Sequence, residues 1–157
     1  MAQTEQKNQN VKKQFEELQS LLERAMALQT SMVLFEWDDE TLAPKGAAEH
    51  TARVIGSLSE QYQEILASMR FKELLDVCQK AEKENAGVFD EVQSAILREA
   101  AEEQERLSCI PPEEYRAYAE LTARATGIWT RAREKNDFAS FAPVSYTHLT
   151  LPTNSLV

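Results

Sequence analysis

The stretch VKKQFEELQSLLERAMALQTSMVLFEWDDET, residues 11 to 41, decides the fold class because its apolar residues recur in steps of three and four. This spacing places them on one face of an α-helix. The face consists of Val11, Phe15, Leu18, Leu22, Ala25, Leu28, Met32 and Phe35. At 1.5 Å per residue the helix is about 45 Å long, slightly more than the diameter of about 40 Å expected for a compact globule of this chain length. The sequence therefore predicts an elongated, all-α array.

Helical spacing continues along the chain and predicts about five long helices in all. The later ones are expected just after Pro44, over about residues 71–84, over about residues 88–107 and from Pro111 and Pro112 onward. Asp137 is placed to cap a further short segment, residues 138–143. No strand is predicted before Pro143.

The overall charge and the apolar pattern exclude several classes of function. With 26 acidic and 17 basic residues the formal charge is −9, so the average surface repels nucleic acid. No run of about 18 apolar residues is present, and the N-terminus lacks the apolar core of a signal peptide. A cytoplasmic protein without a membrane segment is therefore expected. Cys78 and Cys109 stand far apart and indicate neither a disulfide framework nor a thiolate zinc site.

Four acidic residues gather where the first helix is expected to end: Glu36, Asp38, Asp39 and Glu40. Carboxylates oppose the helix dipole at this end, so a compensating base such as Lys45 or Arg53 is expected. Two interpretations remain open, a structural salt-bridge network and the rim of a substrate groove.

Residues typical of catalytic centres are sparse. His50 and His148 are the only histidines, no phosphate-binding glycine loop is present, and no set of serine, histidine and acid can be assembled. A carboxylate-bridged metal site of the four-helix type needs Glu-x-x-His pairs, and neither histidine has a glutamate three residues before it. His50 is interpreted as an exposed helix residue.

Two motifs carry a resemblance to a known family. The first is W-D-x-x-T-x-x-P-x-G, spelled by Trp37, Asp38, Thr41, Pro44 and Gly46, with Arg53 seven residues on. The second is carried by Trp129, Ala132, Arg133, Asp137, Phe138, Phe141 and Pro143. Together they resemble the N-terminal signature of the thermostable carboxypeptidase Taq family of metallopeptidases, over about residues 10 to 143.

The resemblance implies a nearly all-helical, cytoplasmic, metal-dependent carboxypeptidase that removes C-terminal residues from peptides and works as a homodimer. In that family an H-E-x-x-H helix and a further glutamate hold a divalent metal, usually zinc, and the first glutamate can deprotonate the bound water. This sequence contains no H-E-x-x-H. We therefore assign no catalytic or metal-binding residue here and expect the catalytic part to lie outside the sequence.

The first motif has two interpretations. In the structural one, Pro44 and Gly46 separate two helices, Trp37 buries its ring at the corner, and Asp38 and Thr41 satisfy open backbone groups. In the functional one, the corner forms part of the wall over the peptidase groove and contacts the substrate or moves as a lid.

The ends of the chain are interpreted separately from its helical portion, residues 11–143. Residues 1–10 are expected to form a flexible N-terminus. Residues 144–157 contain no charged residue, and VSYTHLTLPT within them is what a sequencing-library adapter encodes when translated. This tail is therefore predicted to be non-native, and either strand-like or loose.

An alternative function is an acidic helical module that binds a basic partner without catalysis. The resemblance to the carboxypeptidase family instead predicts that the chain is an N-terminal fragment that is inactive alone and binds no cofactor. Such a fragment would expose apolar faces that the missing helices would cover.

Overall fold

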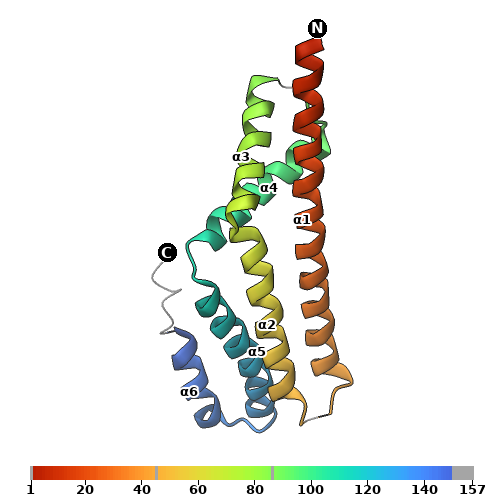
Figure 1. Ribbon diagram of the computed structural model, residues 1–157. Helices are drawn as coiled ribbons and strands as arrows, with labels where there is room; N and C mark the ends of the chain where they lie inside the picture. The colour runs from red at the N-terminus through yellow and green to blue at the C-terminus, as the bar shows by residue number, and fades with distance from the viewer. Residues whose placement is uncertain (1, 45, 86, 150–157) are drawn as a thin grey trace. The chain divides into compact units, whose positions relative to one another are not determined.

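A computed structural model describes residues 2–44, 46–85 and 87–149 of the chain, and all of its regular elements are helices (Figure 1). They are α1 (Ala2–Thr41), α2 (Ala48–Ala67), α3 (Met69–Glu84), α4 (Glu91–Ser108), α5 (Pro112–Glu134) and α6 (Phe138–Leu149). The all-α prediction is confirmed. None of the described helices combines the length and apolar character needed to cross a membrane.

Several helix boundaries differ from those predicted. Helix α1 begins at Ala2 and includes residues 2–10, which were expected to be flexible. No proline or glycine in this stretch stops the helix. Helix α2 begins at Ala48, because residues after Pro44 first form a turn in which the Ala47 amide donates to the Pro44 carbonyl.

The predicted start of α5 is confirmed, whereas the segment after it is longer than expected. Helix α5 begins at Pro112, a first-turn position where the missing proline amide costs no hydrogen bond. Helix α6 continues through Pro143 to Leu149, so residues 144–149 are helical instead of strand-like or loose. The rest of the tail, residues 150–157, lies outside the described residues.

The chain divides into two compact units, each built from two stretches of sequence. Unit 1 comprises Met1–Ala27 and Tyr62–Cys109, and unit 2 comprises Leu28–Gln61 and Ile110–Val157. Helices α1 and α2 contribute to both units. Residues 11–143 were predicted to form one helical portion, and their spacing gives no sign of this division.

Unit 1 holds most of the buried apolar side chains. Phe71, Leu74, Leu75 and Cys78 of α3 form the centre of this core, as their spacing predicts. The rings of Phe15 and Phe89 pack with centroids 5.0 Å apart, which joins α1 to the turn before α4. The core is further made by Val11, Leu18, Ala25, Leu66, Ala81, Val88, Leu97, Ala100 and Leu107.

Polar contacts in unit 1 surround this core. The Arg70 guanidinium donates two hydrogen bonds to the Glu17 carboxylate, at 2.8 and 2.6 Å, and Lys7 pairs with Glu84 at 2.8 Å. Asp90 begins α4 with a capping box: its side chain accepts from the Gln93 amide, and the Gln93 side chain accepts from the Asp90 amide.

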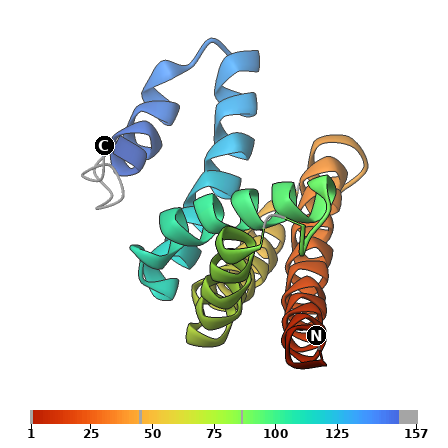
Figure 2. The same ribbon diagram turned by 90° about the horizontal axis from the view of Figure 1, so that it is seen from above.

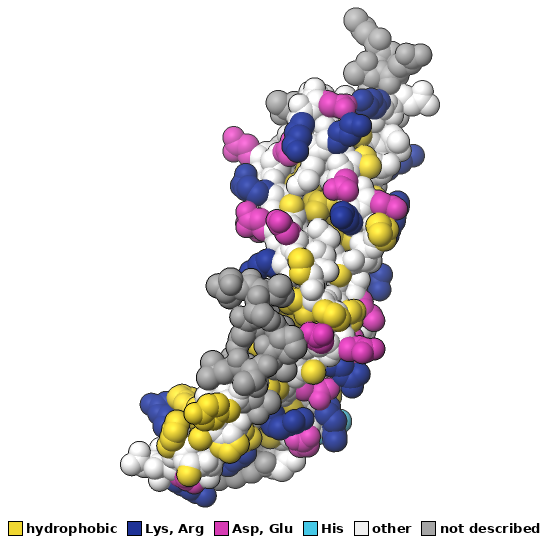
Figure 3. Space-filling view, turned by 90° about the vertical axis from the view of Figure 1, so that its left-hand side faces the viewer, with side chains coloured by type: hydrophobic (Ala, Val, Ile, Leu, Met, Phe, Trp, Pro, Cys, Tyr) yellow, Lys and Arg dark blue, Asp and Glu magenta, His cyan; other side chains and the backbone are white. Residues whose placement is uncertain are grey.

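Unit 2 has a much smaller apolar core. Among its described residues the buried apolar side chains are those of Ala52, Ile55 and Ala132. Helices α5 and α6 pack as an antiparallel hairpin (Figure 2). Hydrophobic side chains gather around α6 on the face shown in Figure 3. Large apolar side chains of unit 2 that stay exposed are Val33, Leu34, Phe35, Trp37, Leu42, Trp129, Phe138 and Tyr146.

Candidate functional site

The first motif forms the end of α1 and the turn after it. The Thr41 hydroxyl donates to the Trp37 carbonyl at 2.6 Å. The Asp38 carbonyl accepts from the amides of Leu42 and Ala43, at 2.9 and 2.8 Å. The two amides satisfy the Asp38 carbonyl, one of the last four carbonyls of the helix. The Thr41 hydroxyl bonds a carbonyl within the helix, so its expected role in satisfying an open backbone group at the corner stays a prediction.

The structure corrects two expectations for this corner. Trp37 is 57% exposed, so its ring does not anchor the junction. The Asp38 side chain is exposed and makes no hydrogen bond with any described residue.

The other first-motif residues lie on the surface as well. Gly46 has φ below zero, and a Cβ added there would meet no atom within 4 Å, so the turn does not require glycine. Pro44 lies between α1, which ends at Thr41, and α2, as predicted. Arg53 is exposed and forms no ion pair with a described acid, which contradicts its expected pairing with the acidic cluster. Lys45, the other expected partner, lies outside the described residues.

The second motif forms the turn of the α5–α6 hairpin. The Arg133 guanidinium lies 5.1 Å from the centre of the Trp129 ring, a cation–π contact. Asp137 caps α6, as predicted: its carboxylate accepts from the Ser140 amide at 3.2 Å and from the Ser140 hydroxyl. These bonds lower the pKa of Asp137, the hydroxyl contact contributing most. Phe138 is 72% exposed.

A cleft of about 480 Å³ opens within unit 2, between the end of α1, the start of α2 and α5. Three acids of the predicted cluster line it, Glu36, Asp39 and Glu40, at the spacing that places side chains on one helix face. Asp38 does not. None of the thirteen residues named for the two motifs lines this cleft.

The salt-bridge interpretation of the acidic cluster is not supported. None of its four acids forms an ion pair with a basic residue in the described part of the chain. Three of the acids, Glu36, Asp39 and Glu40, instead line a cleft, and the second interpretation, the rim of a substrate groove, stays a prediction.

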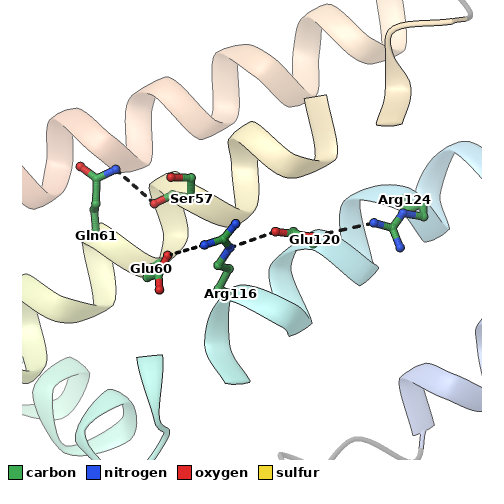
Figure 4. Close-up of polar contacts among 6 residues, drawn as sticks. All are labelled: Ser57, Glu60, Gln61, Arg116, Glu120 and Arg124. Carbon is green, nitrogen blue, oxygen red and sulfur yellow. Dashed lines mark hydrogen bonds and ion pairs between the residues drawn. The ribbon is translucent and has the colours of Figure 1, made fainter. Parts of the chain in front are cut away.

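A network of ion pairs, called the charge ladder below, joins two walls of the cleft, α2 and α5 (Figure 4). It consists of Glu49, Glu60, Arg116, Glu120 and Arg124. The Arg116 guanidinium lies 3.0 Å from both Glu60 and Glu120. Arg124 lies 3.9 Å from Glu120, and its Nε is 3.0 Å from Glu49, although that N–H does not point at the carboxylate. Pairing with the two carboxylates raises the pKa of Arg116.

Gly56 allows this ladder to form. A Cβ at this position would lie 2.1 Å from Cγ of Glu120. Glycine therefore permits α2 and the Glu120 side chain to approach each other closely. Nothing in the sequence predicted this role, because only the tertiary structure places Glu120 against α2.

Two hydroxyls lie in the wall of the cleft on α2. Ser59 is 4% exposed and donates to the thioether sulfur of Met32 at 3.0 Å. Thr51 is 8% exposed, and its hydroxyl makes no hydrogen bond within the described residues. Sequence reasoning missed both. Their spacing of eight residues matches one helix face, but polar residues on an inner face give no distinct signal.

The described residues do not supply a metal centre. Within the ranges that the structure covers, no group of three or more His, Cys, Asp or Glu could hold a metal ion. His50 is exposed, as predicted, and the side chain of His148 lies outside the described residues.

Comparisons with known proteins agree on one family. The family model for carboxypeptidase Taq (M32) metallopeptidases matches residues 17–154. Carboxypeptidase 1 of Bacillus subtilis is 35% identical over 123 residues, which are 78% of this chain and 24% of that protein. Thermostable carboxypeptidase 1 of Pyrococcus furiosus is 28% identical over 120 residues, 76% of this chain and 23% of that protein.

A solved structure has the same fold. The crystal structure of BsuCP matches with a TM-score of 0.78 and 32% identity, over 84% of this chain and 26% of that one. The chain therefore spans about a quarter of the length of the relatives it matches. The family match reaches residue 154 and so includes much of the segment interpreted as a non-native tail.

Proposed function

Because the chain belongs to the carboxypeptidase Taq (M32) family of metallopeptidases, we propose that it forms the N-terminal part of a metal-dependent enzyme that removes C-terminal residues from peptides. The observation that carries this proposal is the family match over residues 17–154, which the fold similarity to BsuCP supports. The family's name implies a divalent metal in the complete enzyme, and we propose zinc.

The metal and the catalytic groups belong to the part of the enzyme outside this sequence. The chain has no H-E-x-x-H, and its described residues include no metal-binding cluster. We therefore derive no catalytic step from the residues present. Their proposed role is to form helical walls beside the catalytic part.

The composition of unit 2 supports this role. Three buried apolar residues, two of them alanines, are few for an independent core, since cores usually depend on large aliphatic and aromatic side chains. Eight large apolar side chains of the same unit are exposed. Hydrophobic side chains gather around α6 (Figure 3), and an exposed apolar patch marks an interaction site. We propose that the remaining polypeptide of the enzyme covers this surface.

The motif residues are proposed to shape this wall. Thr41 and Asp137 hold the two turns through hydrogen bonds, while Trp37, Arg53, Trp129 and Phe138 present exposed side chains toward the remaining protein or the groove. In the complete enzyme, Asp38→Ala separates two roles. A large fall in kcat/KM with unchanged Tm indicates contact in the groove, and a lowered Tm with unchanged kcat/KM indicates a structural role.

Two further properties are proposed from the family resemblance. The complete enzyme is expected to be a cytoplasmic homodimer. Sedimentation of the purified enzyme at several concentrations tests the dimer, and fractionation of source cells tests the location.

The decisive experiment begins with the source DNA downstream of the Pro143 codon. An open frame that encodes H-E-x-x-H and lacks the VSYTHLTLPT codons would support both the peptidase and the non-native tail. The complete protein should then release C-terminal amino acids from N-blocked peptides, and a chelator or a Glu→Gln change in H-E-x-x-H should abolish release. The 157-residue chain serves as the inactive control.

Two results would contradict the proposal. One is turnover by the purified 157-residue chain that a chelator stops. The other is genomic DNA in which the frame ends at Val157, which would favour the acidic interaction module.

A further inference from the structure

The cleft of unit 2 concentrates negative charge. Glu36, Asp39 and Glu40 line it without an ion pair to any described base, and none of its lining residues is Lys, Arg or His. The last turn of α1 also contains no basic residue. The negative end of the helix dipole adds to the same potential. A cation is therefore favoured in the cleft and an anion is repelled.

The Thr51 hydroxyl points independently to a ligand. Thr41, Thr122 and Thr126 each donate their hydroxyl to the carbonyl four residues earlier in the helix. Thr51 is also helical and is more than nine-tenths buried, yet its hydroxyl makes no such bond within the described chain. Its oxygen is not one of the fully enclosed side-chain atoms that lack a partner, so the hydroxyl is open to the cleft that Thr51 lines. In the wall of the cleft it can accept a hydrogen bond from a ligand that enters.

The remaining walls fit the stem of an organic cation better than a metal ion. Met32, Val33 and Ile55 supply apolar surface, and Tyr115 and Tyr118 supply aromatic surface. Aliphatic stems of Lys and Arg pack on such surfaces, and aromatic rings attract their charged ends. The lining acids do not form one of the clusters of three that could hold a metal ion.

We propose that this cleft binds a cationic side chain, Lys or Arg, whose charged end lies among Glu36, Asp39 and Glu40 and donates a hydrogen bond to the Thr51 hydroxyl. The aliphatic stem lies along Met32 and Ile55. The proposal concerns binding by the chain itself and does not rest on peptidase activity.

Titration of the 157-residue chain with N-acetyl-arginine amide tests this site. The probe carries one guanidinium and no other charge. N-acetyl-citrulline amide is its uncharged isostere and serves as the control ligand. Amide NMR shifts of the ¹⁵N-labelled chain are followed during both titrations. Saturable shifts are expected at Thr51 and at the lining residues of α1 with the arginine probe alone, and they should weaken as salt is raised.

Variants identify the groups that bind. Asp39→Asn and Glu40→Gln are each expected to raise Kd by about fivefold to tenfold, because each removes a charge-assisted hydrogen bond. Asp38→Asn makes the same charge change one residue away but outside the cleft, so it should alter Kd by less than about twofold. Glu40 is exposed, so its variant keeps the test valid if Asp39→Asn fails to fold.

Two sources could provide the cation, a polypeptide side chain or a free amine. Butylguanidine, which carries the same single guanidinium on an aliphatic stem but no peptide groups, distinguishes them. Tighter binding of capped arginine indicates a polypeptide, and tighter binding of butylguanidine indicates a free amine. Equal shifts with the citrulline probe, shifts unaffected by the cleft variants, or no saturable shift with any cation would overturn the proposal.

Discussion

Gly56→Ala should destabilise unit 2 although alanine favours helices. Relative to glycine, alanine stabilises a helix interior by about 1 kcal/mol. The new Cβ, however, would lie 2.1 Å from Glu120 Cγ, and 2.8 and 2.9 Å from two further atoms of that side chain. Crowding of this kind costs about 1–3 kcal/mol. Moving Glu120 also weakens its two ion pairs, at about 0.3–0.5 kcal/mol each.

The helix preference of alanine, the crowding and the weakened ion pairs together lower the free energy of unfolding by roughly 0.5–3 kcal/mol. Urea denaturation followed by circular dichroism measures it. Gly127→Ala, in α5, is the matched control, because its Cβ would meet only Arg131 Nη1 at an ordinary 3.7 Å. It should stabilise by about 0.5–1 kcal/mol.

A double-mutant cycle tests the cause. In a Glu120→Ala background the clashing Cγ is absent, so Gly56→Ala should become stabilising, by about 0.5–1 kcal/mol. Such a reversal of sign assigns the loss to contact with Glu120. Equal stabilisation by Gly56→Ala and Gly127→Ala in the unmodified chain would refute the reasoning.

Three further predictions concern capping, titration and thiol reactivity. Asp90→Ala removes the capping box of α4 and should lower the free energy of unfolding by about 1 kcal/mol in urea titrations, whereas Asp90→Asn should retain most of it. The pKa of Asp137 is lowered in the folded chain. The stability that its carboxylate contributes is therefore present when the pH is above 3.8, the ordinary pKa, and is lost as the pH falls through the folded pKa. The stability difference between wild type and Asp137→Ala should therefore shrink in urea titrations as pH is lowered from 6 to below 3.8. Burial raises the pKa of Cys78 to about 11. Iodoacetamide at pH 8 should therefore label only the exposed Cys109 in the native chain and both thiols in denaturant. Mass spectrometry of the labelled chain measures this difference.

Local sequence signals predicted the helical segments and several of their ends. The start of α5 at Pro112 follows from proline's fixed φ and missing amide, and Asp137 caps α6 through its own side chain. Such features depend on residues within one turn. The resemblance carried by two motifs also identified the family, because the order and spacing of their residues are visible without a structure.

Burial in unit 2 was predicted poorly. The apolar face of α1 was expected to be buried as far as Phe35, and Trp37 was expected to anchor the corner, yet both side chains are exposed. Helical spacing identifies a face but does not say whether another element covers it.

The sequence by itself determined the helices, their capping residues and the family, because each depends on neighbours along the chain. The tertiary structure alone decided which faces are buried, why Gly56 must lack a side chain, and how Glu36, Asp39 and Glu40 come to share a cleft with Thr51. The physical reason is that these properties depend on contacts between residues far apart in sequence. Spacing within a single helix carries no information about which other helix lies against it.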